Sequence, residues 1–447
     1  MATKSVSIAM TAALMAAANL IIWFPGESGP DSQSQYAQVV AGHLDDWHPP
    51  IMAWLWSVFR LLADGDPPMF CFQVVFYWLG FGLIAITLAR AGRKFAAWVM
   101  LGVALIPPFL RLSVVLLKDV GMAVTFLSAF AALFWYRAQN REPPAAVAVT
   151  SLILLFYGAL VRANAVFAVA PLFAYIIRPR WLGRPWLLMA ASIPVALALV
   201  PAANVFNHRI LHAEPLRIIR CLQIFDITGV AFYSYDLTVF GPDHSFTRKE
   251  VTACYQPHGF DSLSPWGECH FFWNRLAVSP NLQGTVENLD GRSAMGAEPN
   301  LELSGLWIAA IVRHPLAYAV HRLGYFGSEM TAPPYFDFDV ETIPPPYRAI
   351  YDVVTAPAVW LVIGVGLLVQ LARARSLRRS ASTDAALALL LSGLPYSSAY
   401  FVIGVSTESR YLFWSLIATF AALVISGPEL RMPWGRHHLT RLQDGYP

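Results

Sequence analysis

About ten long apolar stretches limit what this chain of 447 residues can fold into. They lie near residues 5–24, 69–89, 95–112, 120–136, 145–161, 163–177, 186–205, 352–371, 384–403 and 411–426. A helix that spans a membrane needs about 20 mostly apolar residues. Only 13% of the residues are charged, whereas a soluble domain carries roughly 25%. We therefore expect an all-α polytopic membrane protein. The first stretch lacks a convincing cleavage site, which favours a retained anchor over a signal peptide.

Basic residues are distributed unequally over the predicted loops. If the N-terminus is inside, the inner loops and the tail contain Arg90, Arg93, Lys94, Arg137, Arg141, Arg178, Arg180, Arg184, Arg373, Arg375, Arg378, Arg379, Arg431, Arg436 and Arg441. The short outer loops contain only Arg60, Arg111, Lys118, Arg162 and Arg410. By the positive-inside rule, both termini are predicted to be cytoplasmic, in an inner or plasma membrane.

The chain divides into three predicted parts: a transmembrane module over 1–205, an outer soluble domain over 206–350, and C-terminal transmembrane helices with a cytoplasmic tail over 351–447. The middle segment is too long for a structureless loop, so we expect it to fold. It contains Cys221, Cys254 and Cys269, and an outer compartment permits disulfides. The short loop between them favours a pair of Cys254 with Cys269. The alternative is that all the thiols are free and buried.

The first outer loop places three acids and a histidine directly after the first apolar stretch: Asp31, Asp45, Asp46 and His48. Ionisable groups at a membrane edge are costly and usually functional. A helical stretch is expected after Asp31, and Pro49 suits the first turn of a second helix, with Asp46 or His48 near its cap. Simpler interpretations remain open: Asp46 only caps, Asp31 is a solvated carboxylate, and His48 is a hydrogen-bonded interfacial residue.

The other short outer loops also carry charged residues. Lys118 and Asp119 begin a helix whose positive N-terminus favours an acid, so Asp119 could simply cap it. Lys118 could pair with Asp119 or bind an anion. Arg162 has few partners except a phosphate, a carboxylate or the interface, and snorkelling alone is the simpler alternative. Arg410 has a local partner in Glu408.

The outer loops thus gather acids and bases on one side of the membrane. There is no P-loop pattern and no GxGxxG motif after a strand. An outer site has no access to cytoplasmic nucleotides, so a group transfer there needs an activated donor held in the membrane. A lipid phosphate ester suits this requirement, because its tail stays in the bilayer while its phosphate meets Arg and Lys at the interface.

The order of these motifs resembles the GT-C class of membrane glycosyltransferases, which includes protein mannosyltransferases and aminoarabinose transferases. The motifs are Asp31, Tyr36, Asp45-Asp46-Trp47 and Pro49-Pro50, then Lys118-Asp119, Arg162-x-Asn164 and Glu408-x-Arg410-Tyr411. The resemblance covers the membrane module to about residue 205 and the last helices weakly, but not the outer domain. It implies a GT-C-like arrangement with a periplasmic domain. It also implies transfer of a sugar from a polyprenyl phosphate to an envelope glycan, lipid or protein.

The resemblance also implies roles for individual residues. It makes Asp31, Asp119 and His48 catalytic, with Asp31 as the general base. The residues that bind the donor phosphate are Lys118, Arg162 and Arg410. Those that position the sugar or the acceptor are Tyr36, Asp45, Asp46, Asn164, Glu408 and Tyr411. The resemblance makes no cofactor certain; it leaves a divalent metal open, with Asp31 as its ligand, although Ser32 stands where the class frequently has Glu.

Two other functions are compatible with the sequence. A secondary transporter or flippase of an amphiphilic anion would bind its substrate with the same basic residues and perform no chemistry. Transporters tend to show repeated halves with broken helices near the midplane, and no two halves match here. A structural or assembly subunit would leave Asp31 expendable. A nucleic acid partner is not expected.

Overall fold

The computed structural model describes residues 2–177, 184–242, 246–279, 291–332, 348, 356–377 and 380–427. Within these ranges the chain is helical and has no β-strand. This agrees with the all-α prediction. Several arginines that the sequence assigns to the inner side lie outside the described residues: Arg178, Arg180, Arg378, Arg379, Arg431, Arg436 and Arg441.

Seven helices in the described ranges are long and apolar enough to cross a membrane. They are α1 (Ala2–Trp23), α4 (Pro67–Arg90), α7 (Lys118–Arg137), α10 (Pro185–Val205) with the π-turn that continues it to Ile210, α19 (Pro357–Leu377), α20 (Ala381–Ile403), and α21 (Phe413–Ser426) together with the 3₁₀ turn Ser409–Leu412 before it. Two further helices, α16 (Leu303–Arg313) and α17 (Pro315–Met330), pass this test only when joined. A bend of 100° separates them, so they do not form one straight span; counted as one broken span, they would raise the number to eight.

The predicted count of ten spans is not confirmed, because three of the ten stretches form shorter helices. These helices are α5 (Lys94–Ala104), α8 (Ala145–Val161) and α9 (Val166–Ile177). The stretch containing α5 breaks before α6 (Pro107–Leu112), where two prolines cannot donate the hydrogen bonds that would continue a helix. Between α8 and α9, Arg162 has an extended backbone with φ −143° and ψ 121°.

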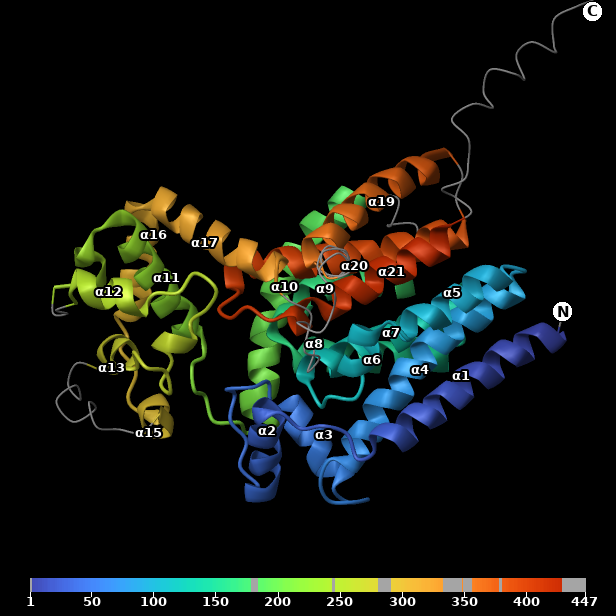
Figure 1. Cartoon of the computed structure of the whole chain (residues 1–447), viewed down its shortest axis with the longest axis horizontal. Coiled ribbons are helices and arrows are strands. Elements are labelled where there is room, and N and C mark those ends of the chain that lie inside the picture. Colours follow the sequence, from blue (N-terminus) through green and yellow to red (C-terminus); the bar gives the residue numbers. More distant parts are fainter. Residues whose placement is uncertain are drawn as a thin grey trace, which may run out of the picture.

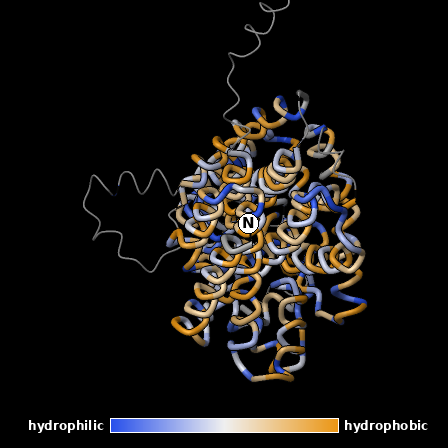
Figure 2. The backbone as a smooth tube through the Cα atoms, turned by 90° about the vertical axis from the view of Figure 1, so that its right-hand side faces the viewer, coloured by the Kyte–Doolittle hydropathy of each residue, from blue (hydrophilic) through white to orange (hydrophobic). Residues whose placement is uncertain are grey.

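The long helices lie alongside one another in a bundle (Figure 1). Helix α4 packs against α1, α5 and α7, while α20 packs against α9, α19 and α21. Much of the helical backbone seen from the N-terminal side has the colour of hydrophobic residues (Figure 2). Helix α1 leaves Met10, Leu14 and Ile21 more than half exposed. Exposed apolar side chains on so apolar a helix are expected where it faces lipid rather than water.

Two arginines near loops predicted to be inner connect the ends of different helices. Arg93, which follows α4, donates to the carbonyls of Val424 and Ile425 at the end of α21, at 2.7 and 2.6 Å. Arg137, at the end of α7, donates to the carbonyl of Ile176 at the end of α9, at 2.8 Å. Basic side chains satisfy the last carbonyls of a helix in this way. The predicted topology requires these helix ends to lie on one side.

A group of shorter helices lies at the end of the molecule opposite the N-terminus (Figure 1). We call it the appended group: α11 (Ile219–Ser234), α12 (Arg248–Cys254), α13 (Phe271–Ala277), α15 (Gly291–Gly296), α16 and α17. A disulfide joins Cys254 to Cys269, with 5.9 Å between their Cα atoms. The favoured cysteine pair is therefore the one in the structure. Cys71 and Cys221 are free thiols.

The first outer loop folds into two helices, α2 (Pro30–Ala41) and α3 (Ile51–Phe59). The helical stretch expected after Asp31 is thus present, and Asp31 lies in its first turn. The predicted cap of the second helix is wrong. The N-cap of α3 is Pro50, and no side chain caps it by a hydrogen bond.

Candidate functional site

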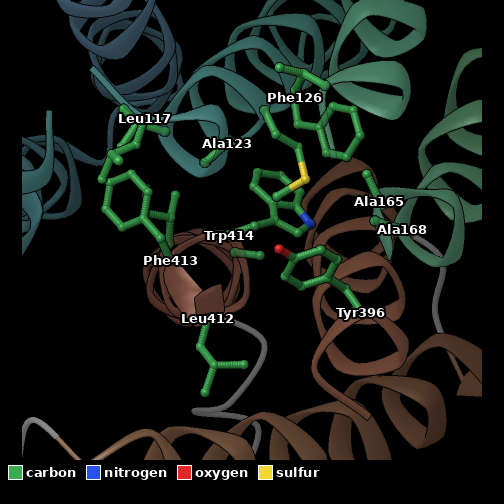
Figure 3. Packing of buried hydrophobic residues seen from close by; sticks show 14 of the residues in the cluster. Leu117, Ala123, Phe126, Ala165, Ala168, Tyr396, Leu412, Phe413 and Trp414 are labelled. Atoms are coloured by element: carbon green, nitrogen blue, oxygen red, sulfur yellow. The ribbon is translucent and has the colours of Figure 1, made fainter. Parts of the chain in front are cut away.

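An apolar core fixes three helix ends side by side, next to the charged loops that the sequence predicts to be outer. Figure 3 shows Leu117, Ala165 and Leu412 in this core, together with Phe126 and Trp414, whose rings meet edge-on at 5.4 Å. The first three residues are fully or nearly fully buried. They come from the starts of α7 and α9 and from the short turn before α21. Lys118, Arg162 and Arg410 lie within three positions of these residues in the sequence, so packing of the core determines where these charges lie.

Asp31 lies between two basic side chains from distant loops. Its Oδ2 atom accepts hydrogen bonds from Nζ of Lys118 and from Nη2 of Arg410, both at 3.2 Å. Burial alone would raise the pKa of the Asp31 carboxyl, but the positive charges of Lys118 and Arg410 outweigh it and hold this pKa well below its usual range. Asp31 is therefore an ionised carboxylate bound by cations, rather than a solvated loop residue.

His48 completes the surroundings of Lys118. Its Nδ1 atom lies 2.8 Å from Nζ of Lys118, and its Nε2 atom lies 3.7 Å from Oδ1 of Asp31. An ammonium can only donate, which assigns Nδ1 as the acceptor and puts the ring proton on Nε2. Burial and the neighbouring Lys118 charge lower the pKa of His48 to about 3. The neutral ring thus orients the Lys118 ammonium next to Asp31.

Arg162 pairs with Asp119. Nε of Arg162 lies 3.1 Å from Oδ1 of Asp119, and its Nη1 lies 3.5 Å from Oδ2. Asp119 is fully buried, so its charge needs this partner. The N-cap of α7 is Leu117, with no side-chain cap; a purely capping Asp119 is therefore wrong. Of the partners predicted for Arg162, the one found in the structure is a carboxylate, that of Asp119.

Two tyrosines hold the Arg162 guanidinium from other directions. Its Nη2 atom donates to the hydroxyl of Tyr400 at 2.9 Å, and the group lies over the Tyr411 ring at 4.3 Å from the centroid. The Arg410 guanidinium lies 5.5 Å from the same centroid. Cations over an aromatic face are attracted to it. The Tyr411 ring therefore connects the two arginines.

Glu408 forms the local pair that the sequence suggested. Its Oε2 and Oε1 atoms lie 2.6 Å from Nε and 2.9 Å from Nη2 of Arg410. Arg410 thus lies between Glu408 and Asp31. Asn164 accepts a hydrogen bond from Nε of Arg162 at 3.2 Å through its Oδ1 atom. We define the charge cluster as Asp31, His48, Lys118, Asp119, Arg162, Glu408 and Arg410.

Two of the predicted positioning residues make their contacts elsewhere. The hydroxyl of Tyr36 accepts from the backbone N–H of Gly65 at 2.7 Å, and its ring packs on Trp56 with centroids 5.2 Å apart. Oδ1 of Asp45 accepts from the backbone N–H of Trp47 at 3.0 Å. These contacts stabilise the fold of the first outer loop.

Asp46 joins the first outer loop to the segment before α11. Its Oδ1 accepts from the N–H of Leu216 at 2.6 Å, and its Oδ2 lies 3.4 Å from Nε2 of His208. Burial raises the pKa of the Asp46 carboxyl. Its observed contacts are therefore with the segment that connects α10 to the appended group.

Three residues near the cluster were not foreseen. Tyr400 binds Arg162, and the hydroxyl of Tyr396 lies 3.3 Å from that of Tyr400. Glu329 accepts from the backbone N–H of Glu408 at 3.1 Å. The two tyrosines, four residues apart in an apolar helix, are a weak signal. Glu329 has no motif around it, so the sequence offers no means of finding it.

The described residues contain no group of three His, Cys, Asp or Glu side chains that could hold a metal ion. The Lys118 ammonium occupies the position between Asp31 and His48 where a cation would lie. This donor set therefore suits an ammonium group, and we derive no step through a metal.

No family model matches the chain, and neither a curated protein nor a solved structure matches it. The function is therefore inferred from the residues of the site and their geometry.

Proposed function

We propose that this protein is a GT-C-type membrane glycosyltransferase. It would transfer a sugar from a polyprenyl-phosphate donor to an acceptor hydroxyl at the outer face of the membrane. One observation carries the proposal: Lys118, Arg162 and Arg410 belong to three separate loops and meet in one cluster with Asp31 and Asp119. Charge gathered at the ends of apolar helices suits a ligand with an ionic head and a lipid tail.

The cluster has donors left for a phosphate. Lysine has three N–H donors and a guanidinium has five, and the contacts of Lys118 use two of its three. Basic and acidic side chains balance in the cluster, three against three. A phosphate that enters must therefore draw Lys118 and Arg410 partly away from Asp31. Arginine suits this exchange because its planar donors match phosphate oxygens.

The movement of Lys118 and Arg410 from Asp31 to the phosphate prepares Asp31 to act as the general base. While Asp31 is bound by two cations, its depressed pKa makes it a poor proton acceptor. When the donor phosphate takes these cations, the pKa of Asp31 rises toward the working pH, where a general base is most effective. The acceptor oxygen then attacks the anomeric carbon, its proton passes to Asp31, and the bond from this carbon to the phosphate oxygen breaks. The polyprenyl phosphate leaves, stabilised by Lys118, Arg162 and Arg410.

In this mechanism His48 and Asp119 act through other residues. His48 orients the Lys118 ammonium, and Asp119 fixes the Arg162 guanidinium. We therefore assign both as positioning residues, although the sequence resemblance grouped them with the catalytic ones. Asp31 is the residue proposed to take the acceptor proton, while Lys118, Arg162 and Arg410 bind the leaving phosphate.

One observation favours a secondary transporter or flippase of an amphiphilic anion as a second candidate. The apolar segment 145–177 is broken at Arg162, and α9 contains Pro171 within its length. Broken helices with a charged residue at the break are common at transporter sites. A transporter would bind the same lipid phosphate but would form no glycosidic product.

The test is to purify the protein and identify co-purified lipids by mass spectrometry. The same preparation is then incubated with a labelled polyprenyl-phosphate sugar. We expect a bound polyprenyl phosphate and labelled product in the wild type, and bound lipid without product in Asp31→Asn. Lipid movement in liposomes without any product would favour the transporter. Absence of both the lipid and the product would overturn the proposal.

We further propose that the charge cluster faces the outer side of the membrane, because the basic loops gather at the other helix ends. Reporter fusions after Arg178 and within 240–300 should report opposite sides, with the second one outside. The same side for both would contradict this orientation.

A further inference from the structure

Helix α17 contacts the loop between α20 and α21 along one of its faces. Nη1 of Arg322 donates to the carbonyl of Gly404 at 2.6 Å, and the hydroxyl of Tyr325 donates to the carbonyl of Ser406 at 3.0 Å. Both side chains are fully buried. Residues three and seven positions apart lie on one helical face, so Glu329 continues the row formed by Arg322 and Tyr325.

Glu329 makes the contact closest to the charge cluster. Its Oε2 accepts from the backbone N–H of Glu408 at 3.1 Å, and the side chain of Glu408 holds Arg410. Glu329 is fully buried, and its Oε1 has no hydrogen-bond partner among the described residues. Burial raises the pKa of Glu329 to about 8, so the carboxyl is mostly neutral at pH 7.

The other end of this row is held by the appended group. Asp226 of α11 pairs with Arg322 and lies 3.1 Å from Nε2 of His321. Trp307 of α16 donates to the same carboxylate at 2.8 Å. Asp226, His321 and Arg322 are fully buried. Side chains in so packed a network have little freedom to move. Helix α17 is therefore fixed relative to α11 and α16.

The segment between α12 and α13 contacts the loop at a second place. The N–H of Phe260 donates to the carbonyl of Val405 at 2.7 Å, and Oγ of Ser406 donates to Asp261 at 3.2 Å. The conformation of residues 404–408 is thus determined from outside the helices that flank the loop. A change in the appended group would reach Arg410 through this loop.

We propose that Glu329 is a positioning residue that holds the backbone at Glu408, so that the appended group sets the orientation of Arg410 toward Asp31. The role in donor binding rests on the proposed glycosyltransferase function. The contact by which Glu329 holds the loop does not depend on that function. A neutral acid and an amide both accept a hydrogen bond through a carbonyl oxygen, and therefore glutamine should replace Glu329.

The experiment compares Glu329→Ala, Glu329→Gln and the control Ser328→Ala, whose hydroxyl bonds within its own helix to the Gly324 carbonyl at 3.1 Å. The first readout is hydrogen exchange of the peptide over 404–411 in the full-length protein. We expect the Glu408 amide to exchange at least about tenfold faster in Glu329→Ala, because an amide that loses its acceptor opens more often. Glu329→Gln and Ser328→Ala should match the wild type.

The second readout is binding of a polyprenyl phosphate. Glu329→Ala should weaken it by roughly tenfold, in line with the loss of one hydrogen bond to the loop, and Glu329→Gln should restore it. Unchanged exchange in Glu329→Ala would overturn the proposal. So would loss of binding in Glu329→Gln with wild-type exchange, because that result requires an ionised carboxylate.

The two proposals fail in different ways. Faster exchange in Glu329→Ala with no polyprenyl phosphate binding in any variant would reject the glycosyltransferase and keep the hold on the loop. If Glu329→Ala does not fold, Glu329→Met gives the same test, since methionine has a similar length and its sulfur is only a weak acceptor. Wild-type exchange of the Glu408 amide in Glu329→Met would then overturn the proposal.

Discussion

The Lys118 ammonium lies 3.2 Å from a carboxylate oxygen of Asp31, 87 positions away in the sequence. A lysine buried next to an ionised acid keeps that acid from accepting protons. The ion pair between Asp31 and Lys118 therefore holds the site in a resting state. A competing anion would have to break this pair.

The first prediction is that Asp31→Asn abolishes transfer while expression and folding stay largely intact. A positioned base contributes roughly 10²- to 10⁴-fold to a rate, so the loss should fall in this range. The matched control is Asp45→Asn in the same loop, whose carboxylate accepts from the Trp47 backbone and which should retain activity. A loss smaller than about tenfold in Asp31→Asn would reduce Asp31 to a structural role.

The second prediction concerns the basic residues. Replacing Lys118 or Arg410 by Ala should weaken polyprenyl phosphate binding by roughly ten- to a hundredfold, as expected for lost hydrogen bonds to a charged group. Arg60→Ala is the control, since Arg60 is another basic residue of an outer loop and pairs with Asp64 at 2.6 Å. Equal binding in wild type and in a variant lacking Lys118, Arg162 and Arg410 would rule out the phosphate site.

The third prediction concerns the pair of Arg162 and Asp119. Arg162→Ala leaves a fully buried carboxylate without its partner, and breaking such a pair costs about 3–5 kcal/mol. The melting temperature in detergent should drop. Adding Asp119→Asn should recover part of the loss, because an amide is cheaper to bury than a charge. If the double variant melts lower than Arg162→Ala, the pairing is not what stabilises these residues.

The fourth prediction is a pH dependence. The pKa of His48 in the folded protein is about 3, below the ordinary value of about 6.5. The unfolded chain therefore binds a proton that the folded chain excludes between these values. This costs about 1.4 kcal/mol of stability for each unit that the pH falls within the window. His48→Gln should lose less stability than the wild type between pH 6.5 and pH 4.

Thermal unfolding at several pH values measures this effect. All other ionisable groups are shared, so the difference between the two proteins isolates His48. The control is His43→Gln, because the His43 side chain is 59% exposed and pairs with Glu214. Parallel pH dependences for wild type and His48→Gln would show that His48 is not held neutral by its burial beside Lys118.

Features that depend on neighbouring residues could be read from the sequence. Apolar stretches become helices in lipid because their backbone groups must bond internally, and this fixed the all-helical class. The helix after Asp31, the local pair of Glu408 with Arg410, and the pairing of Cys254 with Cys269 also depend on short separations along the chain. The number of spans was less secure, since α5, α8 and α9 are apolar but short.

Only the tertiary structure decided which loops meet. Arg410 reaches Asp31 across 379 positions because α7, α20 and α21 pack around one core, and no local pattern encodes that packing. Neighbouring residues also diverge. Within one loop, His48 turns to Lys118 while Asp46 binds the backbone of Leu216, since side chains a few positions apart face different partners once the chain folds. Glu329 approaches the cluster for the same reason: the packing of α17 against the loop between α20 and α21, and not its sequence neighbours, brings it to Glu408.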